Sequence, residues 1–291
     1  MSGAARLRQL LGGSSYTIAP GAVDPLTARL VELAGFDAVY LTGGGYSRSQ
    51  GFPDLGLLTM TEITAWIARV VETVSIPVIG DADTGYGNAL NVVRTVREFE
   101  RTGAAALHLE DQLAPKRCGH YDGKAVISIA EMVGKIKAAV DTRRDERFVI
   151  IARTDARAVE GLDAAIERVE AYLAAGADVG FVEAPQSRAE LATVADRIKA
   201  PLVANIFAGG KTPALPAADL QALGYRLGIY PSQAHRAAIR ATEDVLAELR
   251  RSGDTAAIEH RLATFADRET AVDTKRWESM EQRYLRDIEV P

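Results

Sequence analysis

One short segment places the only cysteine of the chain among residues that could activate it. Lys116 and Arg117 precede Cys118, and Gly119 and His120 follow it. Neighbouring cations stabilise a thiolate, and a nearby histidine permits proton transfer. A lone cysteine is more often a small buried apolar residue, but these charged neighbours argue against burial. We therefore expect a mobile loop that carries a catalytic acid.

Four carboxylates follow two short apolar runs: Asp81, Asp83, Glu110 and Asp111. A charge beside a packed interior must be paired or bound to a metal. Carboxylate oxygens suit a hard cation, and Mg²⁺ keeps several waters while taking one or two carboxylates directly. We predict a shared Mg²⁺ site, with Mn²⁺ as an alternative. Taken singly, each carboxylate is as easily explained as a helix cap or an ion-pair partner.

Other apolar runs also end in polar residues, which are Tyr40, Thr42, Arg153, Glu183 and Asn205. Thr42 is followed by three glycines, whose amides can approach an anion closely, although a flexible loop is the plain alternative. The Asp-Thr-Gly-Tyr-Gly-Asn run at 83–88 lacks the spacing of a phosphate-binding loop, so we interpret it as a sharp turn that ends in a helix cap.

The apolar runs alternate with longer, Ala-rich charged segments, as expected of parallel strands joined by helices. The predicted strands are 16–19, 38–42, 78–81, 105–110, 148–153, 179–183, 202–205 and 226–230. The predicted helices are 24–34, 61–74, 88–102, 129–142, 161–175, 187–199, 216–223 and 232–252. Eight such units in about 250 residues predict an α/β fold, a closed (β/α)₈ barrel of the TIM type rather than an open sheet. In that fold the active site lies at the C-terminal ends of the strands.

Composition limits the classes of partner. The chain has 291 residues, 47% hydrophobic, and 34 basic against 39 acidic residues give a net charge of −5 with no basic run. We therefore expect no nucleic-acid partner. No uncharged apolar stretch reaches about 18 residues, so we expect no membrane span. The single cysteine is typical of a reducing compartment, and we predict a cytoplasmic protein.

We find no internal domain boundary and expect one barrel domain over residues 1–291. Residues 253–291 would form a C-terminal helical extension of that barrel. Leu262, Phe265, Trp277 and Tyr284 would supply its apolar face, which could pack on a second subunit or on its own barrel.

Taken together, the motifs resemble those of the isocitrate lyase and phosphoenolpyruvate mutase superfamily over residues 12–251. The motifs that carry the resemblance are Tyr-Leu-Thr-Gly-Gly at 40–44, Pro-Asp-Leu-Gly at 53–56, Asp-Ala-Asp-Thr-Gly-Tyr-Gly at 81–87, His-Leu-Glu-Asp-Gln at 108–112, Lys-Arg-Cys-Gly-His at 116–120, and Asn205 with Gly-Gly-Lys-Thr-Pro at 209–213. The resemblance implies a (β/α)₈ barrel, Mg²⁺ dependence and a homotetramer made of two dimers that exchange the eighth helix.

The resemblance also implies roles for individual residues. Asp83 would bind the metal directly, and Asp81, Glu110 and Asp111 would act largely through water. The residues implied to contact the substrate or to gate its site are Thr42, Gly43, Gly44, Asp54, Asp81, Gly119, Arg153 and Asn205. The residues implied to act in catalysis are Tyr40, Lys116, Cys118, His120, Arg153 and Glu183.

Within this superfamily the cysteine of the gating loop is typical of carbon–carbon lyases, and mutases lack it. The resemblance implies retro-aldol cleavage of a 2-hydroxy dicarboxylate, an alkylmalate or a methylisocitrate-like acid, to a 2-keto acid and a carboxylate. Cys118 would protonate the carbanion, and either Tyr40 or Glu183 would be the base. The Gly-Gly-Lys-Thr-Pro stretch looks more like the alkylmalate-cleaving branch, with dimethylmalate lyase and petal-death-type proteins, than like dedicated 2-methylisocitrate lyase.

Other readings remain open at this point. An oxaloacetate hydrolase or decarboxylase, or a mutase of the carboxyphosphonoenolpyruvate type, would share the metal and the enolate stabilisation. A barrel that binds keto acids without catalysis is the alternative outside enzymes. Four residues depart from the family pattern and bear on specificity: Thr42, Phe207, Ala208 and His235.

Overall fold

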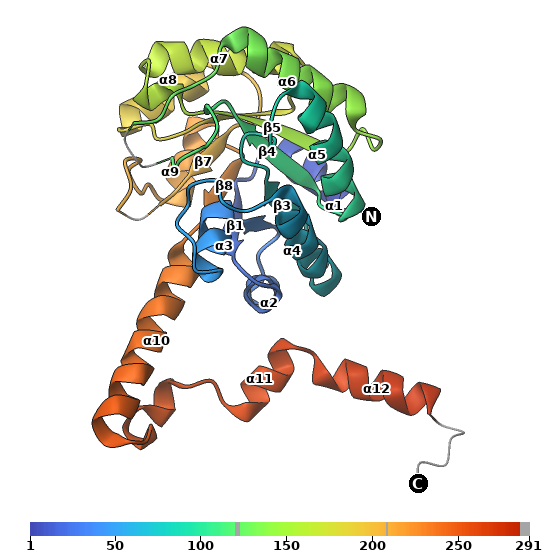
Figure 1. The fold of residues 1–291 in the computed structure, drawn as a ribbon, viewed down its shortest axis with the longest axis vertical. Helices are drawn as coiled ribbons and strands as arrows, with labels where there is room; N and C mark the ends of the chain where they lie inside the picture. The colour runs from blue at the N-terminus through green and yellow to red at the C-terminus, as the bar shows by residue number, and fades with distance from the viewer. Residues whose placement is uncertain (120–122, 208, 286–291) are drawn as a thin grey trace. The chain divides into compact units, whose positions relative to one another are not determined.

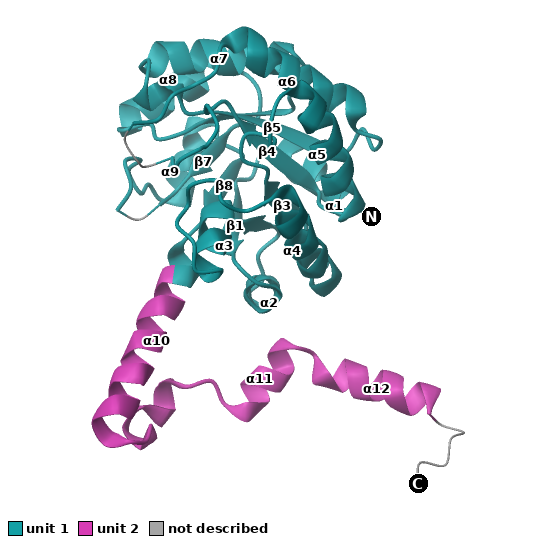
Figure 2. Ribbon diagram, in the orientation of Figure 1, with its two compact units in different colours: residues 1–235 teal, residues 236–291 magenta. Residues whose placement is uncertain are grey.

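The computed structural model describes residues 1–119, 123–207 and 209–285 of the chain. They divide into two compact units, residues 1–235 and residues 236–291 (Figure 2). In the first unit, eight strands lie inside a ring of helices, an arrangement that can be followed in Figure 1. The strands are β1 (Thr17–Ala22), β2 (Val39–Leu41), β3 (Val78–Asp81), β4 (Ala106–Glu110), β5 (Val149–Thr154), β6 (Val179–Val182), β7 (Val203–Asn205) and β8 (Leu227–Tyr230).

All eight predicted strands are present, and they are parallel. Each strand pairs with its neighbours in chain order, and β8 pairs with β1. A bridge between Gly180 and Leu202 links β6 to β7, so the sheet closes on itself. The predicted (β/α)₈ barrel is confirmed. Because parallel strands end at one edge, the polar residues at their C-terminal ends converge at one end of the barrel, which we call the barrel mouth.

The helices of the first unit are α1 (Gly3–Gly12), α2 (Pro25–Leu33), α3 (Gly43–Ser49), α4 (Met60–Thr73), α5 (Ala89–Arg101), α6 (Ile129–Thr142), α7 (Leu162–Ala174), α8 (Arg188–Arg197) and α9 (Ala217–Leu223), with a short 3-10 turn η1 (Ala156–Ala158). The side chains of Asp24, Thr59, Asn88, Ser128 and Ser187 accept hydrogen bonds from the first turns of their helices. Such caps satisfy amides that the helix itself leaves unpaired. They explain why the predicted helix starts hold to within about two residues.

Helix α1, which the sequence pattern did not predict, closes the end of the barrel opposite the mouth. Leu7 and Leu11 pack into the barrel interior with the inward side chains of the strands. Arg8 extends to Asp178 at 2.8 Å and to the carbonyl oxygen of Arg147. The bottom of the barrel is therefore sealed by apolar contacts and an ion pair, which leaves the mouth as the end where polar chemistry gathers.

The second unit is helical, as predicted for the C-terminal extension. It contains most of α10 (Gln233–Ser252), then η2 (Ala256–Arg261), α11 (Phe265–Ala271) and α12 (Thr274–Tyr284). Its apolar side chains are largely exposed, including Leu246, Phe265, Trp277 and Tyr284. The start of the extension at residue 253 and the exchange of a helix remain predictions. No helix in the described part of the chain has the length and apolarity needed to cross a bilayer.

Replacing Gly21 with alanine tests the closure of the barrel between β1 and β8. A Cβ at Gly21 would lie 2.4 Å from the carbonyl oxygen of Pro231 and 2.6 Å from its Cα, so backbone must move. We expect Gly21→Ala to lower the free energy of unfolding by about 1–3 kcal/mol, measured by urea titration. Gly134→Ala, in α6 with no atom within 4 Å of the new Cβ, should raise it by about 0.5–1 kcal/mol. Equal effects of the two variants would contradict the close approach.

Candidate active site

Asp81, the last residue of β3, is a hub of the barrel mouth. Its carboxylate accepts hydrogen bonds from the amides of Gly43 and Asp83 and from the Tyr40 hydroxyl, at 3.0–3.3 Å. Burial would raise the pKa of Asp81, but neighbouring His108, Lys116 and Arg153 lower it to about 2. Asp81 is therefore ionised at neutral pH.

The chain turns sharply after Asp81, as the sequence predicted. Asp83 and Tyr86 have φ angles of 47° and 60°, a left-handed conformation that is strained for residues other than glycine. Two contacts hold this turn: the Asn88 side chain caps α5, and Lys135 of α6 donates a hydrogen bond to the Thr84 carbonyl at 3.1 Å. The strain is thus maintained by packed elements on both sides, and it aims the Asp83 carboxylate at the mouth.

Lys116 joins the carboxylates of two separate segments. Its ammonium lies 2.5 Å from Asp54 Oδ1 and 2.8 Å from Asp83 Oδ1, and its side chain is almost fully buried. Burial alone would lower the pKa of Lys116, but Asp83, Asp54 and Asp81 raise it well above its ordinary value. Burial and the charge of Asp81 raise the pKa of Asp83 to about 7 in spite of Lys116. Lys116 therefore stays cationic, while Asp83 holds its charge only weakly at neutral pH.

The glycine run after Thr42 is helical, so the flexible loop that is the plain alternative for it is wrong. Gly43, Gly44 and Gly45 form the first turn of α3, and the Thr42 hydroxyl caps it by accepting from the Gly45 amide at 3.2 Å. The glycines are required for space, because a Cβ at Gly43 would lie 2.7 Å from Asp81 and one at Gly44 would lie 2.6 Å from Asp54. The run therefore brings two carboxylates close to the backbone.

Arg153, at the end of β5, is the centre of a second charged group. Its guanidinium lies 2.9 Å from Asp155, 3.4 Å from Glu110 and 3.6 Å from Glu183. Asn205 of β7 donates to both oxygens of Glu183 at 3.2 Å. Burial raises the pKa of Glu110 well above its ordinary value, and Glu110 Oε1 accepts no hydrogen bond from the described residues. The mouth thus holds donors and unsatisfied acceptors side by side.

The predicted gating segment lies against this group. A Cβ at Gly119 would meet Arg153 Nη2 at 2.5 Å and Glu183 Oε1 at 2.9 Å, so the backbone of Gly119 touches both residues. Cys118 is half-buried beside it. The Gln112 side chain holds the segment by hydrogen bonds to both backbone groups of Arg117. His120 lies outside the described residues, so its predicted role remains a prediction.

Asp111 lies elsewhere than the other predicted metal-site residues. Its oxygens accept hydrogen bonds from the hydroxyls of Thr154 and Tyr172 and from the amide of Asp155, and Arg168 of α7 lies at 3.3 Å. All four partners come from the end of β5 or from α7. The carboxylate therefore supports that strand end, and its role at a metal through water stays a prediction.

Three residues of the mouth were not among the predicted site residues. His108 Nε2 lies 2.9 Å from the Tyr40 hydroxyl, and its ring stacks on Tyr40. Asp155 pairs with Arg153, and Lys124 pairs with Asp155 at 2.7 Å. Position at a strand end could have indicated Asp155 and the inward side of β4 could have indicated His108, but no sequence signal marks Lys124.

The carboxylates at the mouth fit a hydrated Mg²⁺ ion. Among the described residues, no three His, Cys, Asp or Glu side chains meet as a complete set of metal ligands. Mg²⁺ does not need such a set, because it takes one or two carboxylates and keeps its remaining waters. Asp83 binds the Lys116 ammonium, on which the charges of Asp81 and Glu110 also act. Glu110 Oε1, which accepts no hydrogen bond from the described residues, is available to a metal-bound water. The donor set therefore suits the predicted metal, although Lys116 is the cation at this position in the structure.

Three of the four residues that depart from the family pattern lie at other places than Thr42. Phe207 is half-buried, and burial lowers the pKa of His235. Ala208 lies outside the described residues.

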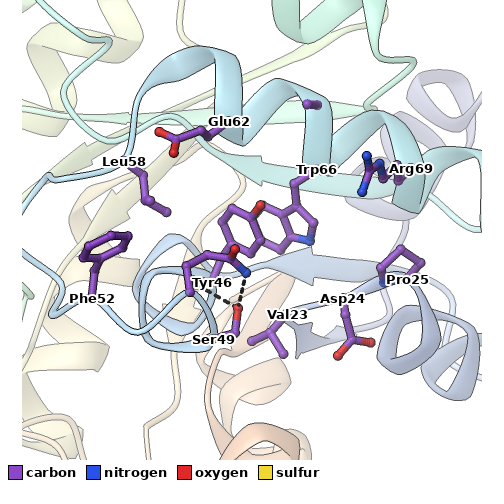
Figure 3. Close-up of a pocket in the computed structure, with 12 residues that line it drawn as sticks. Val23, Asp24, Pro25, Tyr46, Ser49, Phe52, Leu58, Glu62, Trp66 and Arg69 are labelled. Atoms are coloured by element: carbon purple, nitrogen blue, oxygen red, sulfur yellow. Dashed lines mark hydrogen bonds between the residues drawn. The ribbon is translucent and has the colours of Figure 1, made fainter.

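A separate hollow of about 620 Å³ lies beside α3 and α4, where the rings of Tyr46 and Trp66 stack face to face (Figure 3). None of its lining residues belongs to the predicted site.

Comparisons with known proteins agree with this geometry. The phosphoenolpyruvate phosphomutase family model matches residues 7–250. The chain is 46% identical to the 2,3-dimethylmalate lyase of Eubacterium barkeri, over 98% of this chain and 99% of that one. It is 47% identical to the 2-methylisocitrate lyase of Aeropyrum pernix, over 89% of this chain and 83% of that one.

Solved structures give the same result. A crystal structure of 2,3-dimethylmalate lyase matches with a TM-score of 0.93 at 35% identity, covering 100% of this chain and 99% of that one. Oxaloacetate acetylhydrolase in complex with 3,3-difluorooxalacetate matches with 0.92 at 34% identity, covering 97% of each chain. Phosphonopyruvate hydrolase in complex with oxalate and Mg²⁺ matches with 0.90 at 34% identity, covering 98% of this chain and 100% of that one.

The two possible roles of Asp111 are separable by substitution. Asp111→Asn should lower the free energy of unfolding by about 1–3 kcal/mol, because an amide nitrogen would replace a buried oxygen that accepts from Thr154 and Tyr172 or from the Asp155 amide. Its Mg²⁺ affinity, measured by calorimetry, should stay close to that of the parent. Asp83→Asn is the matched control, which should weaken Mg²⁺ binding with little effect on unfolding. Loss of Mg²⁺ binding in a stable Asp111→Asn protein would instead make Asp111 a metal-site residue.

Proposed function

The chain belongs to the phosphoenolpyruvate mutase and isocitrate lyase superfamily, and on that premise we propose that it is a carbon–carbon lyase of small dicarboxylates. Its substrate would be a 2-hydroxy dicarboxylate, an alkylmalate or a methylisocitrate-like acid. The products would be a 2-keto acid and a second carboxylate. Two relatives at 46–47% identity are a 2,3-dimethylmalate lyase and a 2-methylisocitrate lyase, which supports this substrate class.

The observation that carries the proposal is the position of the Cys118 segment at the barrel mouth. Gly119 touches Arg153 and Glu183, so Cys118, the residue before it, is close to the residues that would hold the substrate. A carbanion formed by bond cleavage needs a proton from a group close to that carbon. The single cysteine of the chain is a suitable donor there, whereas a mutase transfers a group and needs none.

Substrate oxygens would be held by the donors of the mouth. Arg153 lies over the Phe181 ring and between three carboxylates, so its guanidinium is fixed in orientation. Asn205 would help it to stabilise the negative charge that develops on the departing carboxylate. Thr42 and the amides of α3 would hold the keto-acid carboxylate, with Gly44 nearer to the gating residue Asp54.

Tyr40 is the better of the two candidate bases. Both oxygens of Glu183 accept from Asn205, which makes that carboxylate a weaker base. Burial raises the pKa of Tyr40 well above its ordinary value, so the phenol keeps its proton until a neighbour accepts it. His108 Nε2 at 2.9 Å is nearer to the hydroxyl than Asp81 Oδ2 at 3.3 Å, and the proton turns from Asp81 to His108 for this step. Burial lowers the pKa of His108, which favours a neutral ring that can accept.

In the proposed reaction a substrate hydroxyl proton moves to the Tyr40 oxygen as the phenol proton moves to His108. The electron pair of the carbon–carbon bond then goes to the departing carbon, and the former hydroxyl carbon becomes the keto carbon. Cys118 gives its proton to the departing carbon. A bound Mg²⁺, held directly by Asp83 and through water by Asp81 and Glu110, would stabilise negative charge on the substrate oxygens.

Cys118→Ser tests this function. Turnover of 2,3-dimethylmalate and 2-methylisocitrate, measured by trapping the keto acid, should depend on Mg²⁺ and stop with EDTA. In Cys118→Ser it should fall by about 10²–10⁴-fold, because a serine hydroxyl is a far weaker acid than a thiol. Oxalate binding in the presence of Mg²⁺, measured by calorimetry, should remain close to that of the parent protein.

The outcomes distinguish the proposal from its main alternative. Near-parent turnover by Cys118→Ser would remove the thiol as the acid. Hydrolysis of oxaloacetate without cleavage of either alkylated acid would replace the lyase by a hydrolase, the activity named for a relative of similar fold.

The proposed assembly is a homotetramer of two dimers that exchange the eighth helix, α10. The second unit supports it, because side chains such as Leu246 and Trp277 are more than half exposed. Apolar surface of this kind in a separate helical unit is usually covered by another subunit. The proposed compartment is the cytoplasm, because a chain with one cysteine has no use for an oxidising environment.

Light scattering should give a mass of four chains of 31.2 kDa each at micromolar concentration. Leu246→Asp should lower that mass, because a charge would enter the covered face. Arg240→Gln, an exposed polar change on the same helix, should not. A parent protein that scatters as a single chain would contradict the exchange.

A further inference from the structure

Lys124 is a buried lysine of the barrel mouth to which no role has been assigned. Its side chain is only 1% exposed, and its ammonium lies 2.7 Å from Asp155 Oδ1. The same ammonium donates a hydrogen bond to the Gly119 carbonyl at 2.5 Å. A lysine is rarely buried without a partner, and here both partners belong to the site.

Lys124 precedes a segment whose backbone is hydrogen-bonded to the residues that follow β4. The Leu113 amide donates to the Ala125 carbonyl at 2.8 Å, and Gln112 forms an antiparallel bridge with Val126. The Ile127 amide donates to the Asp111 carbonyl at 2.9 Å. Because this ladder begins directly after β4, the barrel itself sets the position of the lysine.

Asp155 is shared between two cations. Arg153 donates from Nε to Oδ2 at 2.9 Å and from Nη2 to Oδ1 at 3.2 Å, and Lys124 binds Oδ1 as well. Burial alone would raise the pKa of Asp155, but the charges of Arg153 and Lys124 lower it to about 2. The Asp155 amide donates to Asp111, which fixes this residue from the other side. Lys124 therefore balances a charge that Arg153 would otherwise have to balance alone.

We propose that Lys124 is a positioning residue of the site, which holds the backbone of Gly119, and with it Cys118, against Arg153. The ammonium connects Gly119 to Asp155, Asp155 connects it to Arg153, and Gly119 touches Arg153 directly. These contacts form a closed ring. The inference rests on the proposed function for its catalytic meaning, but the ring itself does not.

The test is the rate at which iodoacetamide alkylates Cys118 in the protein without substrate. Cys118 is the only cysteine, so intact mass reports its alkylation directly. Lys124→Met removes the ammonium at similar volume and should speed alkylation by about fivefold or more, because Gly119 loses its anchor. Lys124→Arg keeps the charge and should return the rate toward that of the parent.

Arg157→Met is the matched control, because it breaks a partly buried ion pair with Glu190 just beyond β5 without touching Gly119. It should leave alkylation of Cys118 unchanged. Should Lys124→Met not fold, as circular dichroism would reveal, Lys124→Gln offers a polar side chain of similar reach that lacks the charge. An alkylation rate within twofold of the parent in a folded Lys124→Met or Lys124→Gln protein would overturn the proposal, as would failure of arginine to rescue.

A second readout connects the ring to chemistry. In Lys124→Met, kcat for 2,3-dimethylmalate should fall by about a hundredfold, and KM should change much less. The reason is that the Cys118 thiol is displaced while Arg153 still binds the substrate. If the parent protein cleaves neither 2,3-dimethylmalate nor 2-methylisocitrate while Lys124→Met is still alkylated faster, the anchoring role of Lys124 stands and only the proposed function is overturned. Unchanged kcat with faster alkylation would overturn the catalytic meaning of Lys124.

Discussion

The constraint on which this site depends is the balance of charge in a buried space. The mouth of the barrel gathers more carboxylates than cations. The carboxylates are Asp54, Asp81, Asp83, Glu110, Asp155 and Glu183, and the cations are Lys116, Lys124 and Arg153. Burial of unbalanced charge is costly, so carboxylates there either find donors or bind protons. The raised pKa values of Asp83 and Glu110 are the protein's own response, and a divalent cation would be the other.

The backbone around the mouth follows from the same constraint. Asp81 and Asp54 can approach α3 only because Gly43 and Gly44 have no side chains. Asp83 points into the mouth only because the turn after β3 is held in a left-handed conformation. Such strain persists where surrounding contacts over-determine it, and here Lys135 and the cap of α5 supply them. Glycines and strain therefore mark the places where carboxylates converge.

Much of this arrangement is predictable from the sequence, because a parallel barrel fixes where strands end. Eight alternating units predict the barrel. The positions of the strand ends then predict which residues converge at the mouth, such as Asp81 and Arg153. The partners of a side chain are less predictable, since Asp111 directly follows the strand-end residue Glu110 yet turns toward α7 and the end of β5. Lys124 could not be found, because its role depends on the path of a chain segment with no periodic pattern.

The segment that contains Cys118 is held in place by ion pairs rather than by apolar contacts. Lys116 binds Asp54 and Asp83 on one side of the thiol, and Lys124 binds Asp155 on the other. Ion pairs are strong where water is excluded and weak where it enters. Each of these pairs helps to exclude water from the other, so the contacts on the two sides of Cys118 strengthen one another. Loss of one pair would admit water and weaken the other, which is why Lys116 and Lys124 stabilise the position of Cys118 together.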